Sequence, residues 1–376
     1  MKIAIVCYPT YGGSGVVATE LGHALSILGH EIHFITYKQP VRLDTLNKNI
    51  FFHEVFVPEY DLFHYQPYEL ALSSRIVDVV KAYKIDVLHV HYAIPHAYAA
   101  YMAKMMLKDE GVSLPIVTTL HGTDITLVGS HPFYKTAVTF SINNSDFVTS
   151  VSKSLKNDTE SLFDINKPIQ VIPNFIDVNK HAHLERPCHR ESVADNKEKI
   201  IIHISNFRPL KRVKDVVKIF EIVQKEIPSK LLMVGEGPER IKAQRYVKKN
   251  NLSEKVLFLG KSNEVNELLC YSDIFLLPSE KESFGLVALE SMLHKVPVIS
   301  TNTGGLSEVN IDGISGYLSS IGDVKQMANN TIKALSNDKL YEKLQKGAFE
   351  QAISFDISNI IPKYEEVYKK ALESSI

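Results

Sequence analysis

The amino-acid sequence predicts an α/β protein built from two Rossmann-like, doubly wound domains. Strand-like apolar runs alternate with amphipathic helical stretches in the first half of the chain, and the same alternation starts again after a polar interruption. The length of 376 residues also exceeds the about 100 to 150 residues typical of one domain. Two domains that repeat one architecture account for both observations.

The first half opens with a strand at 2–8, a helix at 14–29 and a second strand at 31–37. Alternation at this spacing is typical of βαβ units around a parallel sheet. The remaining expected elements of this half are strands at 50–56, 86–92 and 115–121 and a helix at 68–83.

The pattern stops near Asn174, and the polar stretch from about Asp177 to Lys199 is expected to connect the domains. The second half is expected to contain strands at 199–205, 230–235, 255–260, 273–279 and 295–301, with helices at 212–226 and through Lys249. We therefore predict an amino-terminal domain at 1–180, a carboxy-terminal domain at 181–356, and a final helix at about 357–376 that packs back on the first domain.

The composition narrows the class of partner. Lys and Arg together number 42 against 43 for Asp and Glu, so no excess of positive charge indicates nucleic acid or an anionic membrane. No apolar run reaches the roughly 18 residues of a membrane span, and no secretory leader precedes the first strand, so we expect a cytoplasmic protein without stable membrane insertion. A homo-oligomer stays open.

The three cysteines, Cys7, Cys188 and Cys270, are widely and unevenly spaced. This spacing favours reduced thiols over a disulfide framework or a zinc site.

A glycine loop at 12–15 lies between the first strand and the first helix. With Ala18 it satisfies G-x-G-x-x-A, which alone suggests a dinucleotide. The second strand, however, ends in Thr-Tyr-Lys at 36–38 and offers no acidic residue there to hold a ribose. We favour a loop in which Gly13 and Ser14 face a phosphate, with a tight strand-to-helix turn as the structural alternative.

Cationic side chains follow the first strand of the second half, in the string Ser-Asn-Phe-Arg-Pro-Leu-Lys-Arg at 205–212. Ligands of α/β sheets bind at the carboxyl ends of strands, so Asn206, Arg208 and Lys211 lie where a diphosphate is expected. Arginine offers a bidentate fork to phosphate oxygens and lysine a compact charge. A solvated basic turn is the alternative.

Two carboxylates, Glu282 and Glu290, flank a strand-to-helix turn that contains Gly285. The free N–H groups at such a helix start bind anions, and the carboxylates can accept hydrogen bonds from sugar hydroxyls. An acidic turn leading into an ordinary helix would readily explain one glutamate, but it explains the whole string less well.

These three elements, together with MLHKVPVISTNTGGLSEV at 292–309, resemble the retaining family-four glycosyltransferases of the GT-B fold over essentially the whole chain. The resemblance implies a sugar-nucleotide donor and two domains that face each other across a cleft. The stretches HVHYAIPHAYAAYMAK, TTLHGTDITLVG and ISNFRPLKR are similar to those of N-acetylglucosaminyl L-malate synthases. This closer resemblance implies UDP-N-acetylglucosamine as donor, L-malate as acceptor, and the first step of bacillithiol biosynthesis.

The family resemblance also implies roles for single residues. Arg208 and Lys211 would hold the diphosphate, Glu282 the sugar hydroxyls and Glu290 the ribose. His121, which closes a strand, would lie near the reacting carbon of the sugar. Further donor contacts would come from Gly13, Ser14, Asn206, Phe284, Gly285 and Leu286, with uracil near Gly260, Lys261 and Ser262.

No metal ion or cofactor is expected. The sequence contains no D-x-D string, and His89 and His91, two apart on one strand, are better explained as core histidines than as ligands because no third ligand follows at a suitable spacing. Charge on the leaving diphosphate would then be met by fixed cations and helix N-termini. Asp124 is expected to cap its loop rather than to act as a nucleophile.

Acceptor residues are expected at the carboxyl ends of first-half strands, where Ser14, Tyr92 and Thr119 converge. A dicarboxylate beside an anionic donor also needs a cation, for which we select Lys135, with Arg42 as the weaker choice. The alternative for both is a solvated surface charge.

Other functions remain open at this point. A relative that glycosylates a lipid should show a basic, apolar-studded helix, for which 97–108 is the candidate. A sugar-nucleotide epimerase would need an acid and base that are not evident. A nucleotide-sugar-binding protein without catalysis is the third alternative.

Overall fold

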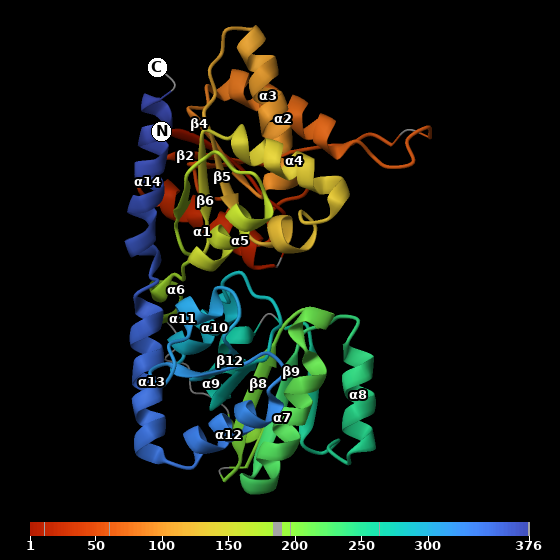
Figure 1. Cartoon of the computed structure of the whole chain (residues 1–376). Coiled ribbons are helices and arrows are strands. Elements are labelled where there is room, and N and C mark those ends of the chain that lie inside the picture. Colours follow the sequence, from red (N-terminus) through yellow and green to blue (C-terminus); the bar gives the residue numbers. More distant parts are fainter. Residues whose placement is uncertain (11, 60, 183–189, 196, 263, 375–376) are drawn as a thin grey trace. The chain divides into compact units, whose positions relative to one another are not determined.

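The computed structural model describes residues 1–10, 12–59, 61–182, 190–195, 197–262 and 264–374. The chain forms two compact units, one of Met1–Phe175 with Ile357–Ile376 and one of Ile176–Asp356 (Figure 1). Each unit contains its own parallel sheet.

The first unit is built on a seven-stranded sheet of order β3-β2-β1-β4-β5-β6-β7, in which every recorded pairing is parallel. The chain winds outward from β1 in one direction and from β4 in the other, so the point where it reverses lies between these two strands. The strands are β1 (Lys2–Val6), β2 (Glu31–Thr36), β3 (Ile50–Glu54), β4 (Val87–His91), β5 (Ile116–Leu120), β6 (Phe147–Ser150) and β7 (Ile169–Val171).

The helices of the first unit include the last helix of the chain. They are α1 (Gly13–Ile27), α2 (Tyr68–Tyr83), α3 (Tyr98–Asp109), α4 (Pro132–Asn143), α5 (Lys153–Leu162) and α14 (Ile357–Glu373), with short turns η1 (Ala93–Ala97) and η2 (Thr123–Leu127). Helix α14 contacts α1, β4 and β5, and Figure 1 shows it in blue against this sheet. Its buried residues Ile361, Tyr364 and Tyr368 recur at helical spacing, which gives α14 one apolar face.

The second unit has a six-stranded parallel sheet of order β10-β9-β8-β11-β12-β13, the same winding as in the first. Its strands are β8 (Lys199–Ile204), β9 (Ser229–Val234), β10 (Val256–Gly260), β11 (Ile274–Leu277), β12 (Val298–Thr301) and β13 (Gly316–Ser319). Its helices are α6 (Val178–Ala182), α7 (Val213–Glu226), α8 (Arg240–Lys249), α9 (Val265–Tyr271), α10 (Leu286–Leu293), α11 (Leu306–Val309), α12 (Val324–Leu335) and α13 (Asp338–Ile353), with turns η3 (Arg190–Ser192) and η4 (Pro209–Lys211).

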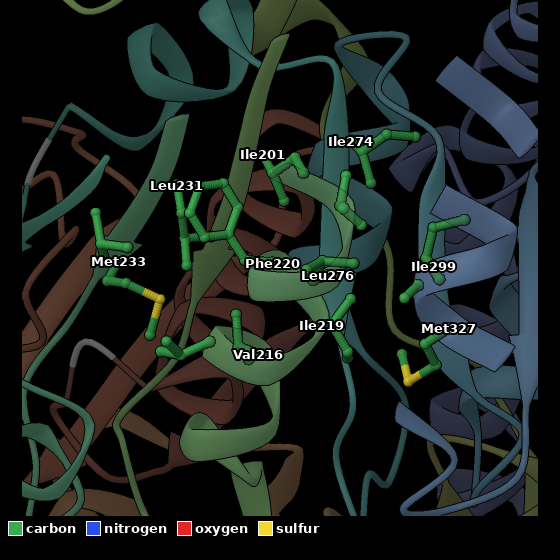
Figure 2. Close-up of a cluster of buried hydrophobic side chains, with 14 of the residues drawn as sticks. Ile201, Val216, Ile219, Phe220, Leu231, Met233, Ile274, Leu276, Ile299 and Met327 are labelled. Carbon is green, nitrogen blue, oxygen red and sulfur yellow. The ribbon is translucent and has the colours of Figure 1, made fainter. Parts of the chain in front are cut away.

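Helix α7 forms the centre of the second unit's core. It packs Val216, Ile219 and Phe220 against buried strand residues, and Figure 2 shows these side chains beside Ile201 and Leu276. The apolar residues of α7 recur every three or four positions, whereas those of the strands alternate between the two sheet faces. The core therefore leaves the carboxyl ends of the strands, where the loops emerge, to carry the site.

The cysteines differ from the expectation of reduced thiols. Cys270, in α9, is disulfide-bonded, so the expectation is wrong for this residue. Cys7 is a buried free thiol, and burial raises its pKa to about 12. Cys188 lies outside the described residues. Sequence spacing could not predict the disulfide, because bonding depends on distance in the folded chain.

Within the part of the chain that the structure describes, no helix is both long and apolar enough to cross a membrane. In α3, Ala99, Ala100 and Ala103 are buried. Met102 and Met106 are instead 37% and 38% exposed.

Candidate functional site

The glycine loop joins β1 to α1 at the reversal point of the first sheet. A Cβ atom on Gly15 would lie 2.6 Å from the carbonyl oxygens of both Tyr8 and Thr10, so the tight turn by itself requires glycine there. Gly12 and Gly13 are exposed at the start of α1. A tight strand-to-helix turn thus explains Gly15 without any ligand. Gly13 and Ser14 remain the loop residues proposed to face a ligand.

Two of the predicted acceptor residues meet directly. Ser14 Oγ lies 2.6 Å from the Tyr92 hydroxyl, although 78 residues separate them in sequence. The Tyr92 ring packs on Tyr8 and His121, with centroid distances of 5.2 and 5.1 Å. The ends of β1, β4 and β5 therefore share one polar and aromatic cluster.

Thr119 does not join this cluster. Its side chain is fully buried, and its Oγ1 lies 2.7 Å from both His89 Nε2 and Thr149 Oγ1. His89 in turn bonds the Tyr368 hydroxyl of α14 at 2.8 Å. The hydroxyl of Thr119 thus has its hydrogen-bond partners inside the core. Its place near a strand end was misleading because successive strand residues point to opposite faces.

His121 lies at the end of β5 and is 9% exposed. Its Nε2 is 2.8 Å from His91 Nδ1, and His96 Nδ1 donates to the His91 carbonyl at 2.5 Å. Burial, assisted by His96, lowers the pKa of His121 to about 3. The ring is therefore neutral near pH 7, and only its Nδ1 remains for a further partner.

Asp124 caps the loop after β5, as the sequence predicts. Its carboxylate accepts hydrogen bonds from the backbone N–H groups of Ala93 at 2.8 Å, His121 at 3.2 Å and Gly122 at 2.9 Å. Burial raises its pKa to about 6, against the opposing effect of these three bonds. Asp124 thereby ties the ends of β4 and β5 together.

A cavity of about 570 Å³ opens beside this cluster in the first unit. Four tyrosines and several aliphatic side chains dominate its wall, with two carboxylates and no lysine or arginine among the lining residues. The lining consists of Tyr8, Glu69, Leu70, Tyr92, Ile94, Pro95, Tyr98, Thr123, Asp124, Val128, Tyr134 and Ala137. Sequence reasoning missed all of these as wall residues except Tyr92, although the position of Tyr8 at the carboxyl end of the predicted first strand could have indicated it.

The two predicted acceptor cations do not line the cavity. Lys135 is exposed on α4, the helix whose Tyr134 and Ala137 do line it. Arg42 is exposed and lies 3.7 Å from Glu20. Lys135 is therefore the direct neighbour in sequence of a wall residue, Tyr134, whereas neither neighbour of Arg42 lines the cavity.

In the second unit, two predicted donor residues form an ion pair. Lys211 Nζ lies 2.5 Å from Glu282 Oε2, with 16% and 17% of the two side chains exposed. Asn206 and Arg208 are exposed in the loop after β8. The structure thus joins the loop after β8 to the loop after β11 through opposite charges.

The paired glycines after β12 support Glu282. A Cβ on Gly304 would lie 1.9 Å from the Glu282 carbonyl oxygen, and Gly305 N–H donates to the same oxygen at 3.0 Å. Gly285 begins α10 with a φ of 99°, a conformation that favours glycine. These glycines allow the close backbone approach that holds the carboxylate loop.

The remaining predicted donor residues fall into two groups. Phe284 is buried with its ring 5.5 Å from that of Phe355, so its side chain packs the core and only its backbone could meet a ligand. Leu286 and Glu290 lie on α10 and are half-buried.

The predicted base-binding stretch follows β10. Lys261 and Ser262 line a cavity of about 360 Å³ together with Leu257, Leu259 and Tyr271. Gly260 is not part of this wall, and its carbonyl accepts from Gly235 N–H at 2.7 Å. In the described part of the chain, no group of three or more His, Cys, Asp or Glu side chains could hold a metal ion.

Comparison with known proteins agrees with this two-unit organisation. Residues 11–180 match the family model described as Glycosyltransferase Family 4, and residues 186–351 match that described as Glycosyl transferases group 1. The solved structure of Anabaena Alr3699/HepE in complex with UDP-glucose shares the fold, with a TM-score of 0.79, 18% identity, and coverage of 98% of this chain and 100% of that chain.

Two curated relatives extend over nearly the full chain. The N-acetyl-alpha-D-glucosaminyl L-malate synthase of Bacillus anthracis is 48% identical over 379 residues, covering 99% of this chain and 97% of that protein. The phosphatidylinositol N-acetylglucosaminyltransferase GPI3 subunit of Saccharomyces cerevisiae (strain YJM789) is 24% identical, covering 100% and 84%. The chain therefore belongs to the GT-B glycosyltransferases, with a family 4 amino-terminal half and a group 1 carboxy-terminal half.

Proposed function

We propose that this enzyme transfers N-acetylglucosamine from UDP-N-acetylglucosamine to the hydroxyl group of L-malate, with retention of configuration, as the first step of bacillithiol biosynthesis. The observation that carries the proposal is the 48% identity, over nearly the whole chain, to a protein named for this reaction. The arrangement of the charged residues supports it.

The donor would bind to the second unit. Arg208 and Lys211 supply positive charge for the diphosphate, and Glu282 supplies a carboxylate for sugar hydroxyls. The 2.5 Å contact between Lys211 and Glu282 supports adjoining diphosphate and sugar subsites. Backbone N–H groups at the start of α10 would add to the stabilisation of the leaving diphosphate. Lys261 and Ser262 remain the residues proposed for uracil.

The histidine and aspartate of the first unit have different proposed roles. Neutral His121 would hydrogen-bond the sugar rather than protonate it, because its pKa is lowered to about 3. Asp124 already accepts three backbone hydrogen bonds, which argues against a role as nucleophile. With no carboxylate assigned to double displacement, the departing phosphate oxygen is the proposed base for the acceptor hydroxyl on the same face of the sugar.

The acceptor would bind in the first unit at Ser14 and Tyr92, whose hydroxyls lie 2.6 Å apart. The nearby cavity offers tyrosines and two carboxylates but no cation. The two negative charges of malate therefore need a lysine or arginine from outside this wall, and Lys135 on α4 is the proposed residue.

The reaction can be tested by offering the purified protein UDP-N-acetylglucosamine with a panel of small hydroxy acids and sugars, and by identifying the products by mass spectrometry. A glycoside of malate and an equal amount of UDP are expected. Transfer to another acceptor would refute malate, and release of free sugar alone would refute acceptor transfer.

Removal of divalent metals is expected to leave turnover unchanged, because Arg208, Lys211 and helix N-termini would meet the charge of the leaving diphosphate. The measurement is UDP release in excess chelator, with added magnesium or manganese as the comparison. Loss of turnover in chelator that either metal restores would contradict metal independence.

The variant Lys135→Ala is expected to raise the Michaelis constant for malate about severalfold while hardly changing that for the sugar nucleotide, because only acceptor binding is weakened. Lys108→Ala, which removes another exposed lysine at the far end of α3, is the matched control and should change neither constant. An equal effect on both substrates, or none on malate, would remove Lys135 from the site.

A further inference from the structure

We propose that His203 and Ser205 position the loop at 205–208 through one directional chain of hydrogen bonds, and so aim Asn206 and Arg208 at the donor diphosphate. The inference rests on the proposed donor-binding role of that loop. His203 itself is fully buried near the end of β8, so it acts through the loop and not by touching the substrate.

The direction of each bond follows from the chemistry of its acceptor. A carbonyl oxygen can only accept, so His203 Nδ1 donates to the Leu276 carbonyl at 2.8 Å. Burial lowers the pKa of His203 to about 4, which keeps the ring neutral near pH 7 and makes Nε2 an acceptor. Ser205 therefore donates its hydroxyl proton to Nε2 at 2.8 Å. The lone pairs of Ser205 Oγ then accept from Phe207 N–H at 3.3 Å.

The chain of hydrogen bonds ends at Phe207, whose backbone conformation is unusual. Phe207 has a φ of +39°, a region that bulky side chains rarely adopt. Its ring is fully buried and stacks on the His203 ring at 6.0 Å. Such a conformation persists only when its surroundings hold it, and here the N–H bond and the buried ring both do so.

Gly235 and Gly237 allow the loop at 205–208 to pack closely against the backbone that follows β9. A Cβ on Gly235 would lie 1.8 Å from the Ser205 carbonyl oxygen, and a Cβ on Gly237 would lie 2.1 Å from that of Asn206. Phe207 O also accepts from Glu239 N–H at 3.0 Å. The backbone is thus fixed on both sides of Phe207, while Asn206 and Arg208 are exposed. Rotation about the backbone bonds of Phe207 would therefore move Arg208 relative to Asn206.

The test compares three serine variants of the full chain by calorimetric titration with UDP and by steady-state kinetics. Ser205→Ala removes both hydroxyl bonds and is expected to raise the Kd for UDP and the donor Michaelis constant about threefold to tenfold, without changing that of the acceptor. Ser205→Thr keeps a hydroxyl and should restore most of the affinity. Ser229→Ala is the control, because the hydroxyl of the buried Ser229 donates instead to the Ile227 carbonyl at the amino end of β9, away from the loop at 205–208.

Hydrogen exchange separates this inference from the proposed function, since it needs no ligand. The Phe207 amide is expected to exchange faster in Ser205→Ala than in Ser229→Ala. Unchanged exchange at Phe207 in Ser205→Ala would overturn the positioning role. So would a Ser205→Ala variant that is less stable but has an unchanged Kd for UDP. If the wild type binds no UDP, the proposed function fails, and the exchange result alone decides whether the Ser205 hydroxyl holds the loop.

Discussion

Replacing either Glu282 or Lys211 by alanine is expected to reduce turnover by about a hundredfold or more, the usual scale for one preorganised electrostatic group. The two side chains meet at 2.5 Å, so each variant removes one charge from the proposed diphosphate and sugar subsites and leaves the other charge without this partner. Because both side chains remain partly exposed, water can solvate the remaining charge, and the folds should persist. Turnover is measured at saturating donor, and folding by circular dichroism.

The matched control is Lys104→Ala. Lys104 and Asp146 form a similar ion pair at 2.6 Å, with 24% and 27% exposure, near the amino end of β6 and away from the strand ends that carry the site. This variant should keep near-normal turnover. Near-normal turnover in Glu282→Ala or Lys211→Ala would instead show that the proposed role of that residue is wrong.

Acidification from pH 7 to pH 5 is expected to destabilise the first unit by about 4 kcal/mol or more, a large part of the roughly 5–15 kcal/mol typical of a folded protein. Burial lowers the folded-state pKa of His89 and His121 to about 3 and that of His96 to about 4. In the unfolded chain the histidine pKa lies near 6.5, so between that pH and pH 5 the unfolded chain binds more protons than the folded chain does. The stabilisation is therefore present above about pH 6.5 and is lost progressively as the pH falls below it. Each histidine contributes about 2 kcal/mol over this range.

Protonation of Asp124 has the opposite effect on stability, and this effect is already included in the value of about 4 kcal/mol. Its folded-state pKa is raised to about 6, so the folded chain gains protons first and recovers about 1.4 kcal/mol between pH 7 and pH 5. The second unit should lose less, because among its described residues His203 is the histidine whose pKa burial lowers to about 4.

The acid effect can be measured by urea unfolding at pH 7, 6 and 5. Circular dichroism is the suitable signal, since the chain has no tryptophan. His89→Gln should lose about 2 kcal/mol less than the wild type between pH 7 and 5, because glutamine does not titrate. His64→Gln, at an exposed position, should behave as the wild type does. Equal pH dependence in His89→Gln and the wild type would contradict the assignment.

Local pattern determined most of the fold. Apolar runs at strand spacing and amphipathic stretches at helical spacing predicted the parallel sheets, because side-chain periodicity follows directly from backbone geometry. The short strands β6, β7 and β13 were not predicted individually, since three or four residues carry too little periodicity. The polar stretch after Asn174 located the domain junction only approximately, and the structural boundary falls between Phe175 and Ile176.

The sequence by itself determined the family and the loops at strand ends that hold the candidate donor residues, because charged residues and glycines recur there in a recognisable order. Only the tertiary structure decided which side chains meet. It paired Lys211 with Glu282 and Ser14 with Tyr92, and it turned Thr119 toward α14. It also revealed the chain from Leu276 through His203 and Ser205 to Phe207. The reason is that sequence order places a residue at a strand end, whereas its partners depend on the sheet face it occupies and on segments brought to that face from far along the chain.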